Sequence, residues 1–153
     1  MEPSEVEAVK AVVASVMHHI DRRRWGKLRP LYEDRVRADY TALFGGSIQD
    51  LPADDLIAAW RKTLSPLVTQ HVLGPIEVEV VGPLATAHSH VRAYHVLSGA
   101  PSGAEWLVAG HYVHILGKSD GAWKIREIAI EVFYQTGNRN LLREAAAVSV
   151  IER

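Results

Sequence analysis

Four polar side chains in this 153-residue sequence have types and positions that could do chemistry. Asp21 lies four residues after Met17, at the edge of an apolar helical stripe, where a carboxylate is poorly placed without a partner. Tyr40 and His111 each alternate with apolar residues in an extended segment, so we expect both to face the core. His71 comes just before a predicted strand. Each residue alone also fits a structural role, such as a core histidine or an exposed carboxylate at a helix end.

The combination of a carboxylate, two histidines and a tyrosine predicts acid–base catalysis. A carboxylate that accepts the Nδ1 proton of a histidine fixes the tautomer and makes the other ring nitrogen a stronger base. A second histidine in the same pocket could act as the matching acid, and a tyrosine hydroxyl could hydrogen-bond an oxyanion as it forms. These groups suit proton abstraction next to a carbonyl, followed by loss of a leaving group.

Other kinds of catalytic site have weaker support in the sequence. The chain has no cysteine, which excludes disulfides, a thiolate zinc site and a cysteine nucleophile. His88 and His90 have the spacing of metal ligands, but they lie on a mostly polar strand face, and we predict no metal site. His95 has the opposite parity on that strand and could line either the pocket or the core. No G-x-S-x-G motif and no glycine-rich phosphate loop is present.

The composition is that of an ordinary globular protein without a strongly charged surface. The chain has 17 Lys plus Arg and 18 Asp plus Glu, so its net charge of −1 gives no basic footprint for nucleic acid. The short basic run Arg22–Arg24 is predicted to be a solvated helix end. The segment MEPSEVEAVK is unlike a signal peptide, and no apolar run approaches the roughly 20 residues of a membrane span. We therefore expect a cytoplasmic protein that binds neither nucleic acid nor membrane.

Helical patterns dominate the first half of the chain and strand patterns the second half. Apolar residues recur at three-and-four spacing from Glu5 to about Arg24, with Ser4 as N-cap and Glu7 as its capping-box partner. Alternating apolar residues after Thr69 predict a series of strands. In chain order the predicted elements are a helix at 5–24, a short helix around 28–32, a strand at 35–44, a helix at 50–64, strands at 76–80, 85–97, 106–116 and 123–134, and a last short helix at 140–150.

Helices followed by a run of strands indicate an α+β fold in which helices cover one face of a curved, mostly antiparallel sheet. A curved sheet closed by helices makes a cone with an apolar pocket, which is the default place for a binding site. Ile128, Ile130 and Val132 alternate on the last strand and are predicted to form an apolar wall. The length favours a single domain spanning residues 1–153.

At the candidate residues the sequence resembles the SnoaL-like branch of the NTF2-like superfamily, and within it the scytalone dehydratases. The similar segments lie between about Ala8 and Asn138 and are IDRRRWGKLRPLYEDRVRADYTALF, VTQH, the GH pair of VAGHYVHIL, DGAWKI and YQTGN. The resemblance implies the NTF2-like cone and catalysis without a cofactor. It is shared with dehydrochlorinases of this fold, which use the same His–Asp pair to remove a proton while chloride leaves. The site residues that it implies are Asp21, Tyr40, His71 and His111.

One position departs from the dehydratase pattern. The dehydratases have a second tyrosine just before the aspartate, and the two tyrosines hold a water on the substrate carbonyl, whereas this chain has Ile20 there. Carbonyl polarisation would then depend on Tyr40 alone or on a group that the sequence does not identify. The residues predicted to contact the substrate are Trp60, Phe44, Ile20, Ile128, Ile130, Val132 and Asn138.

The predicted function is a dehydratase-type lyase that acts on a small, largely apolar cyclic or aromatic carbonyl compound. His71 would be the general base, oriented by Asp21. His111 would be the acid that assists the departure of water, and Tyr40 would bind the carbonyl oxygen. The alternatives are an isomerase or polyketide cyclase with the same dyad, and a ligand-binding domain without chemistry. A homodimer or homotrimer is expected, with its interface at the polar row His88, His90, Arg92 and Tyr94.

Overall fold

The computed structural model describes residues 3–151, which form a seven-stranded sheet with helices on one side of it. The helices are α1 (Glu5–Asp21), α2 (Thr41–Phe44), α3 (Ala53–Leu64) and α4 (Leu141–Ile151), with two short 3₁₀ turns, η1 (Trp25–Lys27) and η2 (Arg29–Leu31). The strands are β1 (Tyr32–Asp39), β2 (Gln49–Pro52), β3 (Val68–Leu73), β4 (Glu77–Val81), β5 (Leu84–Val96), β6 (Glu105–Ser119) and β7 (Ala122–Gly137).

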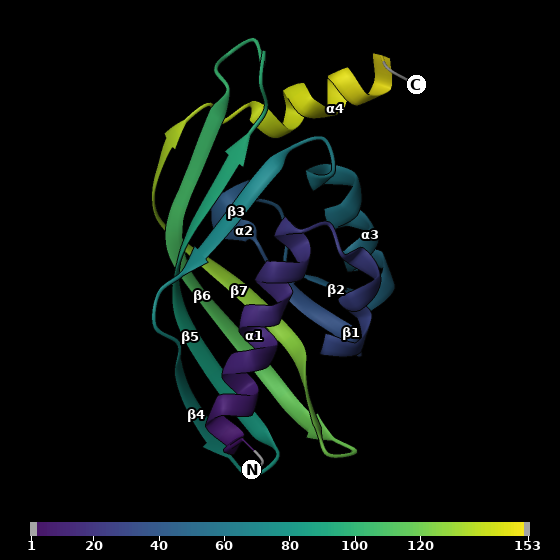
Figure 1. Ribbon diagram of the computed structural model, residues 1–153, viewed down its shortest axis with the longest axis vertical. Coiled ribbons are helices and arrows are strands. Elements are labelled where there is room, and N and C mark those ends of the chain that lie inside the picture. The colour runs from purple at the N-terminus through teal and green to yellow at the C-terminus, as the bar shows by residue number, and fades with distance from the viewer. Residues whose placement is uncertain (1–2, 152–153) are drawn as a thin grey trace.

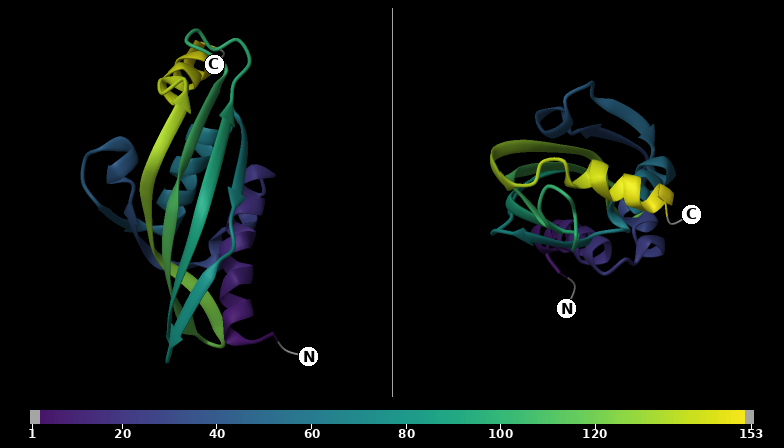
Figure 2. Two further views of the ribbon diagram at one scale, coloured as in Figure 1. Left: turned by 90° about the vertical axis from the view of Figure 1, so that its left-hand side faces the viewer. Right: turned by 90° about the horizontal axis from the view of Figure 1, so that it is seen from above.

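The strands lie in the order β2-β1-β7-β6-β5-β3, and β4 also pairs with β5. Every pairing is antiparallel except that of β1 with β7. The long strands twist and bend along their length, so the sheet is curved (Figure 2). Helices α1 and α3 lie on the same side of this sheet, and α4 lies across one end (Figure 1). The predicted α+β fold with a curved, mostly antiparallel sheet is therefore confirmed.

Helix α1 forms where the three-and-four spacing of apolar residues predicts it, with Val9, Val13 and Val16 fully buried. The Ser4 hydroxyl caps it by accepting a hydrogen bond from the Glu7 backbone N–H at 3.2 Å. The helix ends at Asp21, three residues earlier than predicted, because Arg23 adopts the left-handed backbone region at φ 58°. Asp21 is thus the last helical residue, and the chain turns sharply after it.

Three predicted elements before Leu64 differ from the structure. The helix predicted from Asp50 begins at Ala53, because Gln49–Pro52 pairs with β1 as strand β2. The short helix around Pro30 is replaced by the turns η1 and η2, because proline cannot donate the hydrogen bond that a longer helix needs. The strand predicted to reach Phe44 stops at Asp39, whose carboxylate accepts hydrogen bonds from the backbone and the hydroxyl of Thr41 at 3.1 and 2.6 Å. These bonds begin the short helix α2.

The inward face of β6 is the opposite of the predicted one. Trp106, Tyr112 and His114 are buried on the concave side, whereas His111 lies half-buried on the outer side. The prediction was wrong because both faces of this central strand carry apolar residues, so alternation alone could not distinguish them.

The described helices include none that is both long enough and apolar enough to cross a membrane.

Candidate functional site

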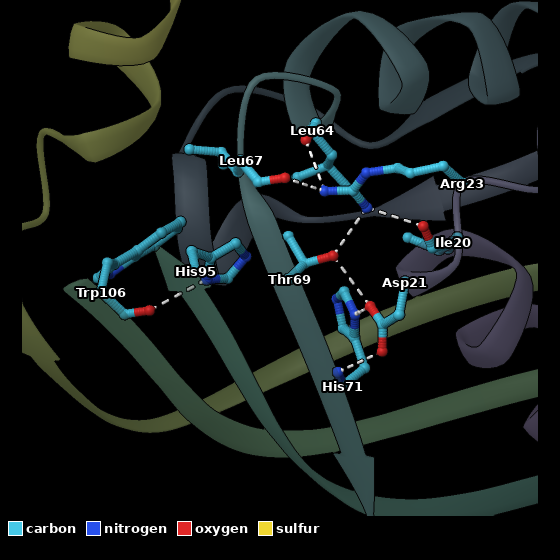
Figure 3. A network of polar contacts seen from close by, with 9 residues as sticks. All are labelled: Ile20, Asp21, Arg23, Leu64, Leu67, Thr69, His71, His95 and Trp106. Carbon is cyan, nitrogen blue, oxygen red and sulfur yellow. Dashed lines mark hydrogen bonds and ion pairs between the residues drawn. The ribbon is translucent and has the colours of Figure 1, made fainter. Parts of the chain in front are cut away.

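The centre of the site is a pair of side chains from α1 and β3. The ring Nδ1 of His71 lies 2.7 Å from Oδ1 of Asp21, and the backbone N–H of His71 donates to Oδ2 at 2.7 Å (Figure 3). The Thr69 hydroxyl donates to Oδ1 at 3.0 Å. Only 8% of the His71 side chain and 17% of the Asp21 side chain are exposed. The structure thus brings together the two residues that the sequence predicted to pair, and it adds Thr69.

The environment of Asp21 keeps its carboxylate ionised and so fixes the tautomer of the histidine. Burial would raise the pKa of Asp21, but the hydrogen bonds and the charge of His71, with the Thr69 hydroxyl, outweigh burial and hold it below its usual value. An ionised carboxylate only accepts hydrogen bonds, so Nδ1 of a neutral His71 carries the hydrogen. Its Nε2 then has a free lone pair, which is the arrangement that a general base needs.

His71 lines a cavity of about 390 Å³ between the concave face of the sheet and helices α1, α2 and α3. This volume falls in the range of small-molecule sites. No Asp, Glu, Lys or Arg is among the described residues that line it, and Asp21 touches it only through His71. The predicted site residues that line the cavity are His71, Tyr40, Ile20, Phe44, Trp60, Ile128 and Ile130.

His95 is the second histidine of this cavity, in place of His111. Its ring centroid lies 6.1 Å from that of His71, and its Nδ1 lies 3.1 Å from the carbonyl oxygen of Trp106 (Figure 3). A carbonyl only accepts, so Nδ1 carries the hydrogen and a neutral His95 has its lone pair on Nε2. Burial lowers the pKa of His95 from 6.5 to about 4. The parity of His95 on its strand was the sequence signal for this position.

Tyr112 is a site residue that the sequence analysis missed. It lies on β6 with its side chain toward the cavity, where Tyr40 also contributes. Burial raises the pKa of both phenols. The neighbouring tyrosines raise that of Tyr40 further and the charge of Asp21 raises that of Tyr112, so both hydroxyls stay protonated. The cavity therefore holds two tyrosines even though Ile20 stands beside Asp21. Choosing the correct face of β6 would have found Tyr112.

Three predicted site residues lie away from the cavity. His111 faces outward, opposite His90 on β5, with its ring stacked on His88 at a centroid distance of 5.3 Å. Val132 is partly buried and packs against the core, but it does not line the cavity.

Asn138 is the third of these residues, and its role is structural. Its side-chain amide donates to the Gly103 carbonyl and to Glu144, both at 2.9 Å, and its Oδ1 accepts from the Asn140 backbone at 2.9 Å. It therefore joins the start of α4 to the β5–β6 loop. Its polar atoms are used at this junction, and it is not among the residues that line the cavity.

Within residues 3–151, no group of three or more His, Cys, Asp or Glu side chains is placed to hold a metal ion. The histidines on the outer face contact one another through their rings, with His90 edge-on to His111 at 5.7 Å. The chemistry that the cavity itself offers is one oriented imidazole base, one neutral imidazole and two phenol donors within an apolar enclosure.

Comparisons with known proteins agree with this geometry. A SnoaL-like domain matches residues 2–129. The Kfla4162 protein of Kribbella flavida superposes with a TM-score of 0.85 at 25% identity, covering 91% of this chain and 97% of its own. A protein of Novosphingobium aromaticivorans provisionally assigned as a scytalone dehydratase gives 0.75 at 19% identity, covering 88% and 87%.

A third solved structure, the hexachlorocyclohexane dehydrochlorinase LinA-type3 of Novosphingobium barchaimii, gives a TM-score of 0.68 at 18% identity, covering 86% of this chain and 88% of its own. Because both of these structures are less than 25% identical to this chain, they show a shared fold. The domain match spans most of the chain, and the predicted resemblance is confirmed. The chain belongs to the SnoaL-like domain family and has the NTF2-like fold.

Proposed function

We propose that this protein is a cofactor-independent lyase that acts on a neutral, largely apolar cyclic or aromatic carbonyl compound. The observation that carries this proposal is the 2.7 Å contact between His71 and Asp21 beside a cavity whose lining, among residues 3–151, contains no Asp, Glu, Lys or Arg. A charged substrate would find no counter-ion there, whereas an aromatic one would meet Trp60 and Trp106. The names of the dehydratase and dehydrochlorinase neighbours support an elimination.

The first step is removal of the proton next to the carbonyl. Nε2 of His71 takes this proton, and Asp21 stabilises the imidazolium that forms, as the carboxylate of a catalytic triad does. The negative charge that develops on the carbonyl oxygen accepts a hydrogen bond from the Tyr40 or Tyr112 hydroxyl. General base catalysis of this kind contributes about 10²–10⁴-fold to the rate.

The second step is departure of the leaving group. His95 is poorly suited to be its acid, because its Nδ1–H is used by the Trp106 carbonyl and its lowered pKa of about 4 keeps the ring neutral near pH 7. We assign the acid role to the His71 imidazolium, which gives its proton to the departing hydroxyl. The substrate then loses one hydrogen and one hydroxyl as water from the same face, and His71 returns to its neutral form.

An isomerase is the second candidate. It is favoured by the poor suitability of His95 as an acid, which leaves His71 as the one group that moves a proton. A single imidazole that accepts a proton at one carbon can return it to another without any leaving group. Product mass separates the two candidates, because isomerisation conserves mass and dehydration lowers it by one water.

The test uses 3-hydroxy-1-tetralone, a neutral bicyclic β-hydroxy ketone that gives 1-naphthol on loss of water. The wild-type protein is expected to form 1-naphthol, His71→Ala to lose about 10²–10⁴-fold in kcat, and the outer-face control His111→Ala to keep the wild-type rate. Wild-type turnover by His71→Ala would contradict the assignment. Binding of the ketone without turnover, and with an affinity that His71→Ala leaves unchanged, would instead indicate a ligand-binding domain.

A further inference from the structure

Arg23, the middle residue of the basic run, is part of the site rather than of a solvated helix end. Its neighbours Arg22 and Arg24 are exposed, whereas Arg23 is partly buried. Its guanidinium donates to the carbonyl oxygens of Ile20 and Leu64, both at 2.8 Å, and also to that of Leu67. These acceptors lie at the end of α1, at the end of α3 and in the segment that leads into β3 (Figure 3).

The same guanidinium also contacts the dyad through one intermediate. Nη1 of Arg23 donates to the Thr69 hydroxyl at 2.9 Å. Arginine can only donate, so the Thr69 oxygen accepts this bond and its own hydrogen points to Oδ1 of Asp21, 3.0 Å away. Oδ1 in turn lies 2.7 Å from Nδ1 of His71. The arginine therefore directs the Thr69 hydroxyl toward Asp21, and the carboxylate, held there, accepts from Nδ1 of His71.

The backbone at Arg23 supports a specific role for this residue. Its φ of 58° lies in the left-handed region, which non-glycine residues seldom adopt. The turn comes two residues after Asp21 and directs the Arg23 side chain toward the end of α3 and the start of β3. Four hydrogen bonds then hold the guanidinium in place. Arg23 thus bonds both to the helix that carries Asp21 and to the strand that carries His71.

We propose that Arg23 is a positioning residue that acts on His71 through Thr69 and Asp21, holding the imidazole in one orientation and one tautomer. This inference rests on the proposed function for its catalytic consequence, but the orientation of His71 can be measured without any substrate. Burial lowers the pKa of Arg23, and the charge of Asp21 offsets part of that effect.

The experiment compares Arg23→Ala and Thr69→Val with two matched controls, Thr69→Ser, which keeps the hydroxyl, and Arg24→Ala, which removes the exposed neighbour. Nitrogen-15 NMR of the His71 ring reports its tautomer directly. The wild-type, Thr69→Ser and Arg24→Ala proteins are expected to show one tautomer with hydrogen on Nδ1. Arg23→Ala and Thr69→Val are expected to show a mixture of the two tautomers. Thr69→Val is nearly isosteric, so it tests the chain of bonds even if Arg23→Ala fails to fold.

Turnover of 3-hydroxy-1-tetralone gives the kinetic readout. Arg23→Ala and Thr69→Val are expected to lower kcat by about 10- to 100-fold, the scale of a misplaced catalytic group, with KM changed by much less. A single Nδ1–H tautomer in folded Thr69→Val, or a loss in Thr69→Ser as large as in Thr69→Val, would overturn the inference. Absence of wild-type turnover would overturn the proposed function instead, while the tautomer measurement would still decide the role of Arg23.

Discussion

Asp21 contacts His71 twice, through the ring Nδ1 and through the backbone N–H, and both contacts measure 2.7 Å. The two oxygens of one carboxylate therefore hold one residue at two points, which fixes the plane of the carboxylate relative to the strand. The ring orientation follows from this arrangement, because Nδ1 must stay near Oδ1. The relationship also joins the last residue of α1 to the middle of β3.

Replacement of Asp21 by asparagine tests the charge in this relationship. Asp21→Asn keeps the shape but removes the negative charge that stabilises the imidazolium, so kcat for 3-hydroxy-1-tetralone is expected to fall by about 10²–10⁴-fold with little change in KM. Asp55→Asn, on the exposed side of α3, is the matched control and should behave as wild type. Equal kcat values for Asp21→Asn and wild type would show that the carboxylate has no part in proton transfer.

The two pocket tyrosines are expected to share the stabilisation of the oxyanion. Tyr40→Phe and Tyr112→Phe each remove one hydroxyl donor, and loss of one such donor lowers kcat by about 10²–10³-fold where it contacts the developing charge. Tyr94→Phe, on the outer face of β5, is the control. Steady-state kinetics of the three variants identifies the donor, and unchanged kcat in both pocket variants would remove the phenols from the mechanism.

Two buried histidines predict how stability depends on pH. Burial lowers the pKa of His95 and of His114 from 6.5 to about 4, so the unfolded chain binds their protons at a higher pH than the folded protein does. Stability should therefore fall as the pH drops from 6.5 towards 4, by on the order of 3 kcal/mol per histidine. Urea titrations at several pH values measure this slope.

His114→Leu isolates one of these contributions. His114 is fully buried, and neither ring nitrogen has a hydrogen-bond partner among the described residues. Leucine removes both unsatisfied nitrogens, so the free energy of unfolding at pH 7.5 is expected to rise by about 1–3 kcal/mol and its slope below pH 6.5 to become shallower. An unchanged slope would mean that His114 titrates normally in the folded protein.

The outer face of the sheet predicts self-association. We propose that the row His88, His90, Arg92 and Tyr94 contacts a second copy, and light scattering after size-exclusion chromatography should give two or three times the mass of the chain. The double substitution Arg92→Glu and Tyr94→Glu should lower that mass. A monomeric wild-type protein at micromolar concentration would rule out this interface.

Sequence patterns could predict the long helices, the long strands and the dyad, but not the short elements α2, β2 and β3, and only part of the cavity. The helical spacing before Asp21 and the family segments around His71 place both residues without any coordinates. His111 was misplaced because β6 is apolar on both faces, and Tyr112 was missed for the same reason. The role of Arg23 depends on a backbone turn and on contacts with residues more than 40 positions away, which no local pattern contains.

The central claim, that His71 removes a proton next to a carbonyl, is tested most directly with a ketone that has no leaving group. Proton NMR of 1-tetralone in deuterium oxide follows exchange of its α-hydrogens. The wild-type protein and His111→Ala should catalyse this exchange at equal rates, and His71→Ala should reduce it towards the uncatalysed rate. Exchange by His71→Ala at the wild-type rate would contradict the claim.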